Sequence, residues 1–336
     1  MNYSDFLKMV PEASLVSILI ILFVADFISA KAQERKWFNP LVCVLMFAQT
    51  LVCLLPQVAT SAFGGMYVTS NSVEAMKAIL SFGTLIVLIQ SKTWAIKSGK
   101  EGEFYMLIVS TLIGMYVMMS AGHFLMFFLG LEMASVPLAT TVAFDKYRND
   151  SAEAAAKFIL TATFSSGVML YGISLLYAAT GTLYYDDVVS KITPSALSIM
   201  GLVFFFSGLG FKISLVPFHF WTADTYQGAP TSVTGYLSVV SKGAAAFTLC
   251  TILMKVFASL VTYWTCLLFI VIVLSITIAN LFAIRQSELK RFMAFSSISQ
   301  AGYIVLAIVG NTSMSVTALS FYVLVYVVAN MAVFTI

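Results

Sequence analysis

The chain has 336 residues, of which 60% are hydrophobic and only 10% are charged, and its formal net charge is +3. Soluble domains carry about 25% charged residues, so this composition excludes an ordinary soluble protein. The apolar runs are long and continuous rather than alternating, which excludes a membrane β-barrel and predicts an all-α polytopic membrane protein. The basic residues are spread over short loops, so the sequence has no dense basic tract for binding nucleic acid.

The sequence also lacks the short motifs of soluble active sites. No Walker loop, GxGxxG or HExxH pattern occurs. The four cysteines lie within or at the edge of apolar runs and form no CxxC pair. We interpret them as small apolar residues rather than as metal ligands or disulfide partners.

About eleven apolar runs are long enough to cross a bilayer, and we predict a helix for each. In chain order they cover residues 15–28, 40–55, 73–90, 104–121, 124–144, 154–178, 195–217, 231–254, 264–284, 293–309 and 314 onward. Pro217 removes a backbone donor and interrupts the seventh run.

The loops between these runs predict the orientation of the chain. With the N-terminus outside, eleven lysines and arginines fall in inner loops and three in outer segments. Cytoplasmic loops carry the excess of basic residues in membrane proteins, so we predict an extracytoplasmic N-terminus.

Three charged residues lie deep inside the predicted spans: Glu132, Lys212 and Lys242. A charge at the centre of a span costs about 3 kcal/mol or more, and such residues usually mark an ion or proton pathway. Lys242 has about ten residues on each side, which places it about 15 Å from either boundary, beyond the reach of a lysine stem. We therefore favour proton transfer over a purely structural charge for these three residues.

Three further ionisable residues are less clear from the sequence. Lys157 lies within about one turn of its helix end, so both a functional role and snorkelling to the interface stay open. His219 follows Pro217 closely, and a proton relay and a hydrogen-bonded interface histidine are equally compatible with its place. Lys77 lies three residues after Glu74, a spacing that allows a local ion pair and needs no functional explanation.

Several stretches of this sequence resemble one known family. The segment PFHFWTADTYQGAPTSV from Pro217, GLEMASVP around Glu132 and ELKRFMAFSSISQAGY from Glu288 look like signatures of the antiporter-like subunits of respiratory complex I, which are shared with Mrp-type cation/proton antiporters. The QGAP form ending at Pro230 and the following SKGAAAF are most similar to the subunit N family of NADH-quinone oxidoreductase. The resemblance covers nearly the whole chain.

The resemblance implies a fold of two inverted five-helix repeats, each with a broken helix. Residues 1–102 would then hold three N-terminal helices, 103–258 the first repeat and 259–336 part of the second. The family has about fourteen helices, with an exit lysine or glutamate on the twelfth. We therefore expect the polypeptide to continue beyond Ile336.

The resemblance also implies a function: proton translocation in the membrane arm of an NADH:quinone oxidoreductase of the cell inner membrane. Glu132 would modulate Lys212, Lys242 would continue the path, and Lys157 would neighbour the pair. No cofactor is expected in this chain, because NADH, FMN, iron–sulfur clusters and quinone would be handled by partner subunits. A component of a cation/proton antiporter and a structural membrane subunit stay open as alternatives.

Overall fold

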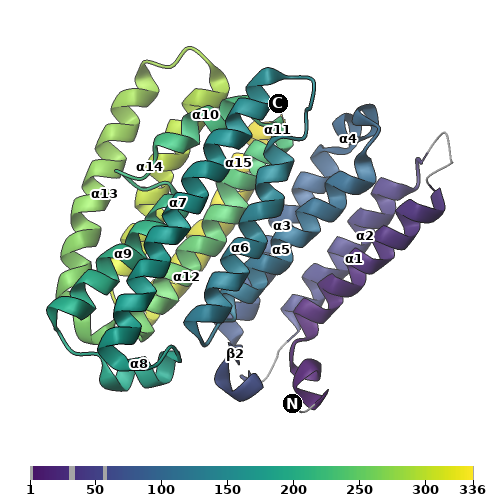
Figure 1. The fold of residues 1–336 in the computed structure, drawn as a ribbon. Helices are drawn as coiled ribbons and strands as arrows, with labels where there is room; N and C mark the ends of the chain where they lie inside the picture. The colour runs from purple at the N-terminus through teal and green to yellow at the C-terminus, as the bar shows by residue number, and fades with distance from the viewer. Residues whose placement is uncertain (1–2, 30–34, 56–58, 336) are drawn as a thin grey trace.

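A computed structural model describes residues 3–29, 35–55 and 59–335 of the chain, and most of them lie in helices (Figure 1). Within these residues, ten helices have the length and apolar composition to cross a membrane, and an eleventh apolar helix, α2, is shorter. The predicted all-helical membrane fold is therefore confirmed, as are the places of its eleven spans.

Three helices form the N-terminal group, coloured purple to blue on one side of the bundle in Figure 1. They are α1 (Val10–Ser29), α2 (Phe38–Leu54) and α3 (Asn71–Gln90). A short 3₁₀ helix, η1 (Tyr3–Lys8), precedes them. The loop before α3 contains a small antiparallel hairpin of β1 (Ser61–Ala62) and β2 (Tyr67–Val68), joined by the 3₁₀ turn η2 (Phe63–Gly65).

The next spans form a continuous series of helices. They are α5 (Glu101–Met119), α6 (Phe124–Val142), α7 (Asn149–Thr180), the broken pair α9 (Ala196–Ile213) and α10 (Phe220–Gly228), and the composite α11 (Thr231–Tyr236), η3 (Leu237–Ser241) and α12 (Lys242–Lys255). The last three are α13 (Val261–Ile284), α14 (Leu289–Val309) and α15 (Ser313–Thr335). The short helices α4 (Lys92–Ser98), α8 (Tyr185–Lys191) and η4 (Ala258–Leu260) lie in connections that the sequence predicted as loops.

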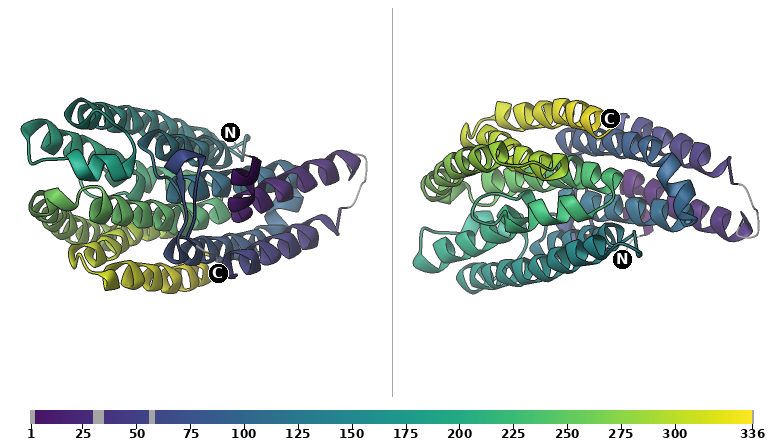
Figure 2. Two further views of the ribbon diagram at one scale, coloured as in Figure 1. Left: turned by 90° about the horizontal axis from the view of Figure 1, so that it is seen from below. Right: turned by 90° about the horizontal axis from the view of Figure 1, so that it is seen from above.

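The composite helix α11–α12 lies at the centre of the bundle. Its spanning window is 89% buried, against 28% for α1 and for α7. Viewed along the bundle, the green α12 segment lies between the teal α6 and α7 on one side and the yellow α14 and α15 on the other (Figure 2). A charged residue on α12 is therefore far from lipid as well as far from water.

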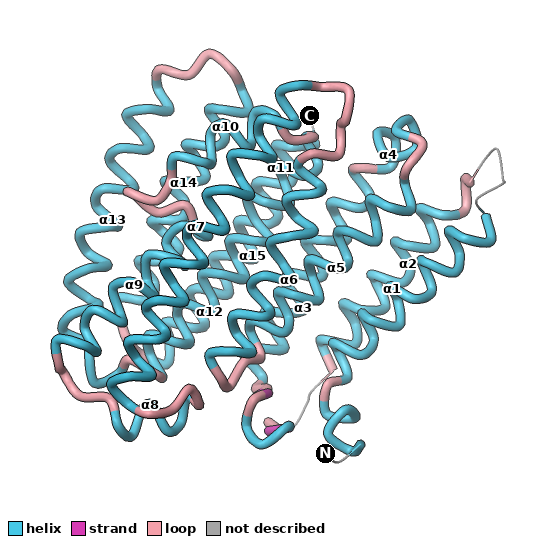
Figure 3. The backbone as a smooth tube through the Cα atoms, in the orientation of Figure 1, coloured by secondary structure: helices cyan, strands magenta, loops and turns pink. Residues whose placement is uncertain are grey.

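Two interruptions break the regular helices near this centre. The chain leaves α9 at Ser214, whose φ is 67°, and returns to a helix at Phe220; Figure 3 draws the segment between them as a loop within the bundle. Side chains satisfy part of the freed backbone: the Trp221 indole donates to the Phe211 carbonyl at 3.1 Å, and the Val216 amide donates to Ser275 Oγ at 2.9 Å. The second interruption is the π-helical turn η3, which the sequence did not predict.

Candidate functional site

Lys212 lies in the last turn of α9, where the helix is about to break. Its side chain is buried, with 5% of the residue exposed, and its Nζ donates to Ser135 Oγ of α6 at 2.7 Å. The Phe158 ring of α7 lies 6.0 Å from the same nitrogen. Lys212 is thus held between two helices by one hydroxyl and one aromatic ring.

Glu132 lies in the middle of α6, one turn before Ser135. The sequence predicted a buried carboxylate here, but the bundle does not enclose the residue. The residue is partly exposed on the outside of this chain, and no hydrogen bond or ion pair within 4 Å joins it to another described residue. Depth along a helix is visible in a sequence, whereas the direction of the side chain around the bundle is not. Glu132 lies one helical turn from Ser135, the residue that accepts the hydrogen bond of Lys212.

Lys242 is the first residue of α12 after the π-helical turn, and the prediction that it is deeply buried is confirmed. Only 1% of the residue is exposed. Its Nζ donates to Ser297 Oγ of α14 at 2.7 Å and lies 5.4 Å from the Tyr226 ring centroid. Ser297 also approaches the Tyr226 hydroxyl at 3.4 Å. A π-helical turn inside an α-helix frequently marks a functional site.

A row of aromatic rings links the surroundings of the two lysines. The Phe158 ring, which lies over Lys212, is 5.0 Å from Trp221, and Trp221 is 6.4 Å from Tyr226, which lies beside Lys242. The structure therefore brings the two lysines to opposite ends of one buried aromatic row. The serine and tyrosine partners were not identified from the sequence, because a hydroxyl in an apolar run carries no signal of what it faces.

The broken helix carries a group of buried polar atoms without a hydrogen-bond partner in the described part of the chain. They are Ser214 Oγ, His219 Nδ1, Thr222 Oγ1 and Thr225 Oγ1. They run from the break into α10, between the helix of Lys212 and the residue Tyr226 that contacts Lys242. Buried polar atoms of this kind are usually satisfied by internal water. Thr225 was not identified from the sequence.

The Lys157 side chain lies in a charged network at the surface. Its side chain is 45% exposed, and its Nζ is 2.7 Å from both Glu153 Oε1 and Asp224 Oδ2. Asp224 also accepts from Arg291 at 2.8 Å. These residues line an open hollow of about 230 Å³ at the start of α7, and the snorkelling alternative describes the position of Lys157.

His123 is the N-cap of α6, and its Nδ1 accepts from the Leu125 amide at 3.0 Å. Burial lowers the pKa of His123, which favours the neutral ring that this acceptor role requires. The four cysteines carry free thiols. In the described ranges, no three histidine, cysteine or acidic side chains are grouped so that they could hold a metal ion.

Comparison with known proteins agrees with this architecture. Residues 121–336 match the family model described as NADH:quinone oxidoreductase/Mrp antiporter, TM. The chain is 55% identical to the NADH-quinone oxidoreductase subunit N of Phocaeicola vulgatus, over 99% of this chain and 71% of that one. It is 48% identical to the subunit N of Azobacteroides pseudotrichonymphae, over 99% of this chain and 70% of that one.

Solved structures of related membrane subunits have the same fold. A chain of respiratory complex I from Thermus thermophilus superposes with a TM-score of 0.80 and 30% identity, over 96% of this chain and 69% of that one. A chain of the Mrp complex from Dietzia superposes with a TM-score of 0.81 over 97% of this chain and 64% of that one, but its 19% identity establishes a shared fold alone. This chain belongs to the subunit N family of NADH-quinone oxidoreductase, the antiporter-like membrane subunits of respiratory complex I.

Proposed function

We propose that this chain moves protons across the membrane as a subunit of an NADH:quinone oxidoreductase, and that Lys212 and Lys242 are its proton-holding groups. One observation carries the proposal: two buried lysines are joined by a broken helix with four unpartnered polar atoms. A chain of water molecules along those atoms would give protons a path from one amine to the other.

The chemistry follows from the partners of each amine. Each lysine donates to a single serine hydroxyl, which accepts a hydrogen bond but does not compensate a positive charge. Burial disfavours the charged form of an amine, and a carboxylate nearby favours it. A change in the distance between Glu132 and Lys212 would therefore make that amine hold a proton or release it.

The energy required is modest. A membrane potential of about 150 mV costs about 3.5 kcal/mol for each charge moved across the bilayer. Forming or breaking one ion pair in a buried site changes the protonation free energy by a similar amount, since one pKa unit is about 1.4 kcal/mol. One carboxylate acting on one lysine is thus sufficient to drive a proton against the potential.

Three further residues extend the path in this proposal. His219 lies at the break, and its buried Nδ1 without a partner would bind the same chain of water, which supports a relay role. Lys157 and Asp224 form the surface hollow at one end of the bundle, where they would collect protons for the broken helix. This end carries most of the basic loops and is the cytoplasmic side in the predicted orientation.

The redox chemistry would take place in partner subunits of the same complex. The relatives are named as subunits of NADH-quinone oxidoreductase, an enzyme that uses NADH and a quinone. This chain would be a translocating subunit in the inner membrane, next to other membrane subunits and lipid, with NADH, FMN, iron–sulfur clusters and quinone handled elsewhere. Its division into three N-terminal helices, a first repeat ending at 258 and part of a second repeat stays a prediction.

The deciding experiment measures proton pumping by the assembled complex in sealed vesicles. Lys212→Met and Lys242→Met should each abolish pumping driven by NADH while the complex still assembles. Lys255→Met is the matched control, because Lys255 is a partly exposed lysine paired with Asp186 at 2.7 Å. Normal pumping by both buried-lysine variants would contradict the proposal.

Other outcomes would select one of the alternatives. Proton exchange driven by a cation gradient, without NADH, would identify a component of a cation/proton antiporter. Loss of assembly with a normal number of protons pumped by each complex that does form would identify a structural subunit.

A further inference from the structure

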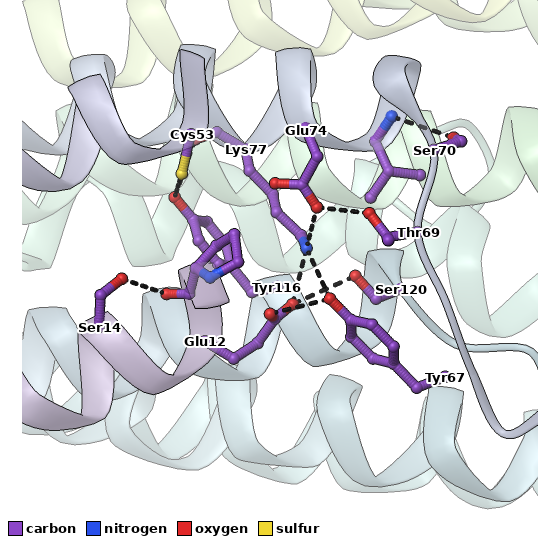
Figure 4. A network of polar contacts seen from close by, with 12 residues as sticks. Glu12, Ser14, Cys53, Tyr67, Thr69, Ser70, Glu74, Lys77, Tyr116 and Ser120 are labelled. Carbon is purple, nitrogen blue, oxygen red and sulfur yellow. Dashed lines mark hydrogen bonds and ion pairs between the residues drawn. The ribbon is translucent and has the colours of Figure 1, made fainter. Parts of the chain in front are cut away.

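A second group of buried charges lies among the N-terminal helices, away from Lys212 and Lys242. Lys77 of α3 is fully buried, and its Nζ is 2.7 Å from Glu12 Oε1 of α1 and 2.8 Å from Glu74 Oε1 (Figure 4). Glu12 and Glu74 are 4% and 3% exposed. The predicted pair of Glu74 and Lys77 is therefore confirmed, but the sequence missed Glu12, which lies 65 residues before Lys77.

The two carboxylates have different surroundings. Glu12 accepts from the Tyr67 hydroxyl at 3.0 Å on Oε2 and from Ser120 at 3.2 Å on Oε1, in addition to Lys77 (Figure 4). Glu74 accepts from Thr69 at 2.5 Å and from Lys77, both on Oε1. Glu74 Oε2 is buried and has no hydrogen-bond partner in the described part of the chain.

The charges in this cluster do not balance if every group is ionised. One ammonium faces two carboxylates, which leaves one negative charge in a site closed to water. Taking an unpaired charge out of water is far more costly than binding one proton. The cluster becomes neutral when one carboxylate is protonated, and the hydrogen bonds indicate which: both oxygens of Glu12 are stabilised as an anion, whereas one oxygen of Glu74 is not.

No other described group is seen to supply the missing positive charge. Lys8 of η1, which precedes α1, is paired with Asp5 at 3.1 Å. The remaining titratable groups beside the cluster are Tyr67, Tyr116 and Cys53, which are neutral in their protonated forms. The neighbouring α11 and α15 carry no charged residue. On α12, which also packs against α3, the Lys242 amine is bonded to Ser297 and Lys255 is paired with Asp186.

We propose that the cluster of Glu12, Lys77 and Glu74 binds one exchangeable proton, which Glu74 holds on Oε2. The cluster would then be a second protonatable site of this subunit, built on helices α1 and α3. It lies near the start of both helices, at the end of the bundle that holds the N-terminus and the β-hairpin (Figure 1). The hollow at Lys157 and Asp224 lies at the opposite end.

A line of buried polar side chains leads from this cluster toward the centre of the bundle. Lys77, Ser81 and Thr84 follow one another on a single face of α3, and all are fully buried. The Tyr116 hydroxyl bonds both the Lys77 carbonyl and Ser81. Thr84 lies beside the Tyr236 hydroxyl, one helical segment before Lys242. This line of hydroxyl groups gives the cluster a polar connection toward the interior of the bundle.

Two matched substitutions test where the proton resides, because glutamine has the shape of a protonated glutamate. In the assembled complex, Glu74→Gln should leave the amount of assembled complex close to wild type. Glu12→Gln should reduce it several-fold, because Lys77 then loses its only fully charged partner in a buried site. Glu103→Gln, which changes a largely exposed carboxylate on α5, is the control for the loss of one acidic group.

Infrared difference spectra between acid and alkaline buffer provide a readout that a merely structural cluster would not produce. A carboxylic acid band that shifts in heavy water should be present in the wild-type complex and in Glu103→Gln, and absent in Glu74→Gln. Thr69→Ala, which removes the hydrogen bond to Glu74 Oε1, should move the same band without removing it.

The inference would be overturned if the spectra of Glu74→Gln and the wild type were the same. It would also be overturned if Glu74→Gln reduced assembly as much as Glu12→Gln, since both carboxylates would then be ionised in a fixed cluster. Neither result depends on pumping, so the Lys212→Met and Lys242→Met experiment can fail or succeed independently of this one.

Discussion

At the scale of single residues, the position of a charge in a span is less informative than the partner that it meets. Lys212 and Lys242 each donate to one serine, from α6 and from α14. Lys77 is equally buried but meets two carboxylates. The first arrangement gives the amine only a neutral acceptor within hydrogen-bond distance, whereas the second gives it two carboxylates.

The serine partner of Lys212 provides a prediction at this scale. Ser135→Ala removes the acceptor from a buried amine, which costs about 1–3 kcal/mol and disfavours the charged state further. We expect slower pumping in vesicles with a normal amount of assembled complex. Ser174→Ala is the control, because that exposed hydroxyl bonds only the backbone of its own helix. Equal pumping in the two variants would remove Ser135 from the path.

Glu132 provides a second prediction. We expect Glu132→Gln to reduce pumping, because a neutral amide no longer favours the charged form of Lys212, and Glu132→Asp to restore most of it. The measurement is the number of protons pumped for each NADH oxidised. Equal values for the two variants would show that the charge of residue 132 does not control Lys212.

At the scale of helices, close packing depends on small residues at crossing points. A Cβ atom added at Gly130 of α6 would collide with the Met118 backbone of α5, and one added at Gly114 of α5 would collide with the backbone around Ala134. Glycine at these positions lets the two helices approach closely, as is common in membrane proteins. This close packing also fixes the position of α6 along its axis relative to α5. Helix α6 carries both Glu132 and Ser135.

This packing predicts opposite effects for two glycine substitutions. Gly130→Ala should destabilise the complex, since the backbone of α5 has no room to yield. Gly167→Ala, also inside a helix but with open space around it, should be neutral or stabilise by up to about 1 kcal/mol through helix propensity. Thermal unfolding of the purified complex compares them; equal shifts in both variants would contradict the role of the crossing point.

The cap of α6 gives a further prediction. His123→Asn keeps a side-chain acceptor for the Leu125 amide, whereas His123→Leu removes it at a cost of about 1 kcal/mol. Because the pKa of His123 is lowered in the folded protein, its contribution to stability is present at neutral pH and decreases as the pH falls. The stability difference between wild type and His123→Leu should therefore shrink on acidification. A difference that is constant with pH would exclude the neutral histidine as the cap.

At the scale of the whole molecule, the two ends of the bundle differ in how their charged residues are exposed. The end with Lys157, Asp224 and Arg291 has an open charged hollow, whereas the other end has the buried cluster around Lys77. The direction of proton flow depends on which end faces the cytoplasm, and the distribution of basic loops predicts that it is the end with the hollow.

Cysteine labelling tests this orientation directly. Tyr147 is 99% exposed in the loop after α6, and Ser190 is exposed on α8 at the other end of the bundle. A membrane-impermeant thiol reagent should label Tyr147→Cys only in inside-out vesicles and Ser190→Cys only in right-side-out vesicles. The reverse pattern would invert the predicted orientation and the assignment of the entry side.

The sequence by itself determined the membrane class, the places of the eleven spans, the break at Pro217 and the depth of Lys212 and Lys242 along their helices. These are local properties, because the thickness of the bilayer sets the length of each apolar run and proline acts on its own backbone. Only the tertiary structure decided that Lys212 meets Ser135, that Glu132 is partly exposed and that Glu12 reaches Lys77. Such contacts depend on which helices are neighbours and on how each is rotated, and a continuous apolar run with almost no polar face does not encode that rotation.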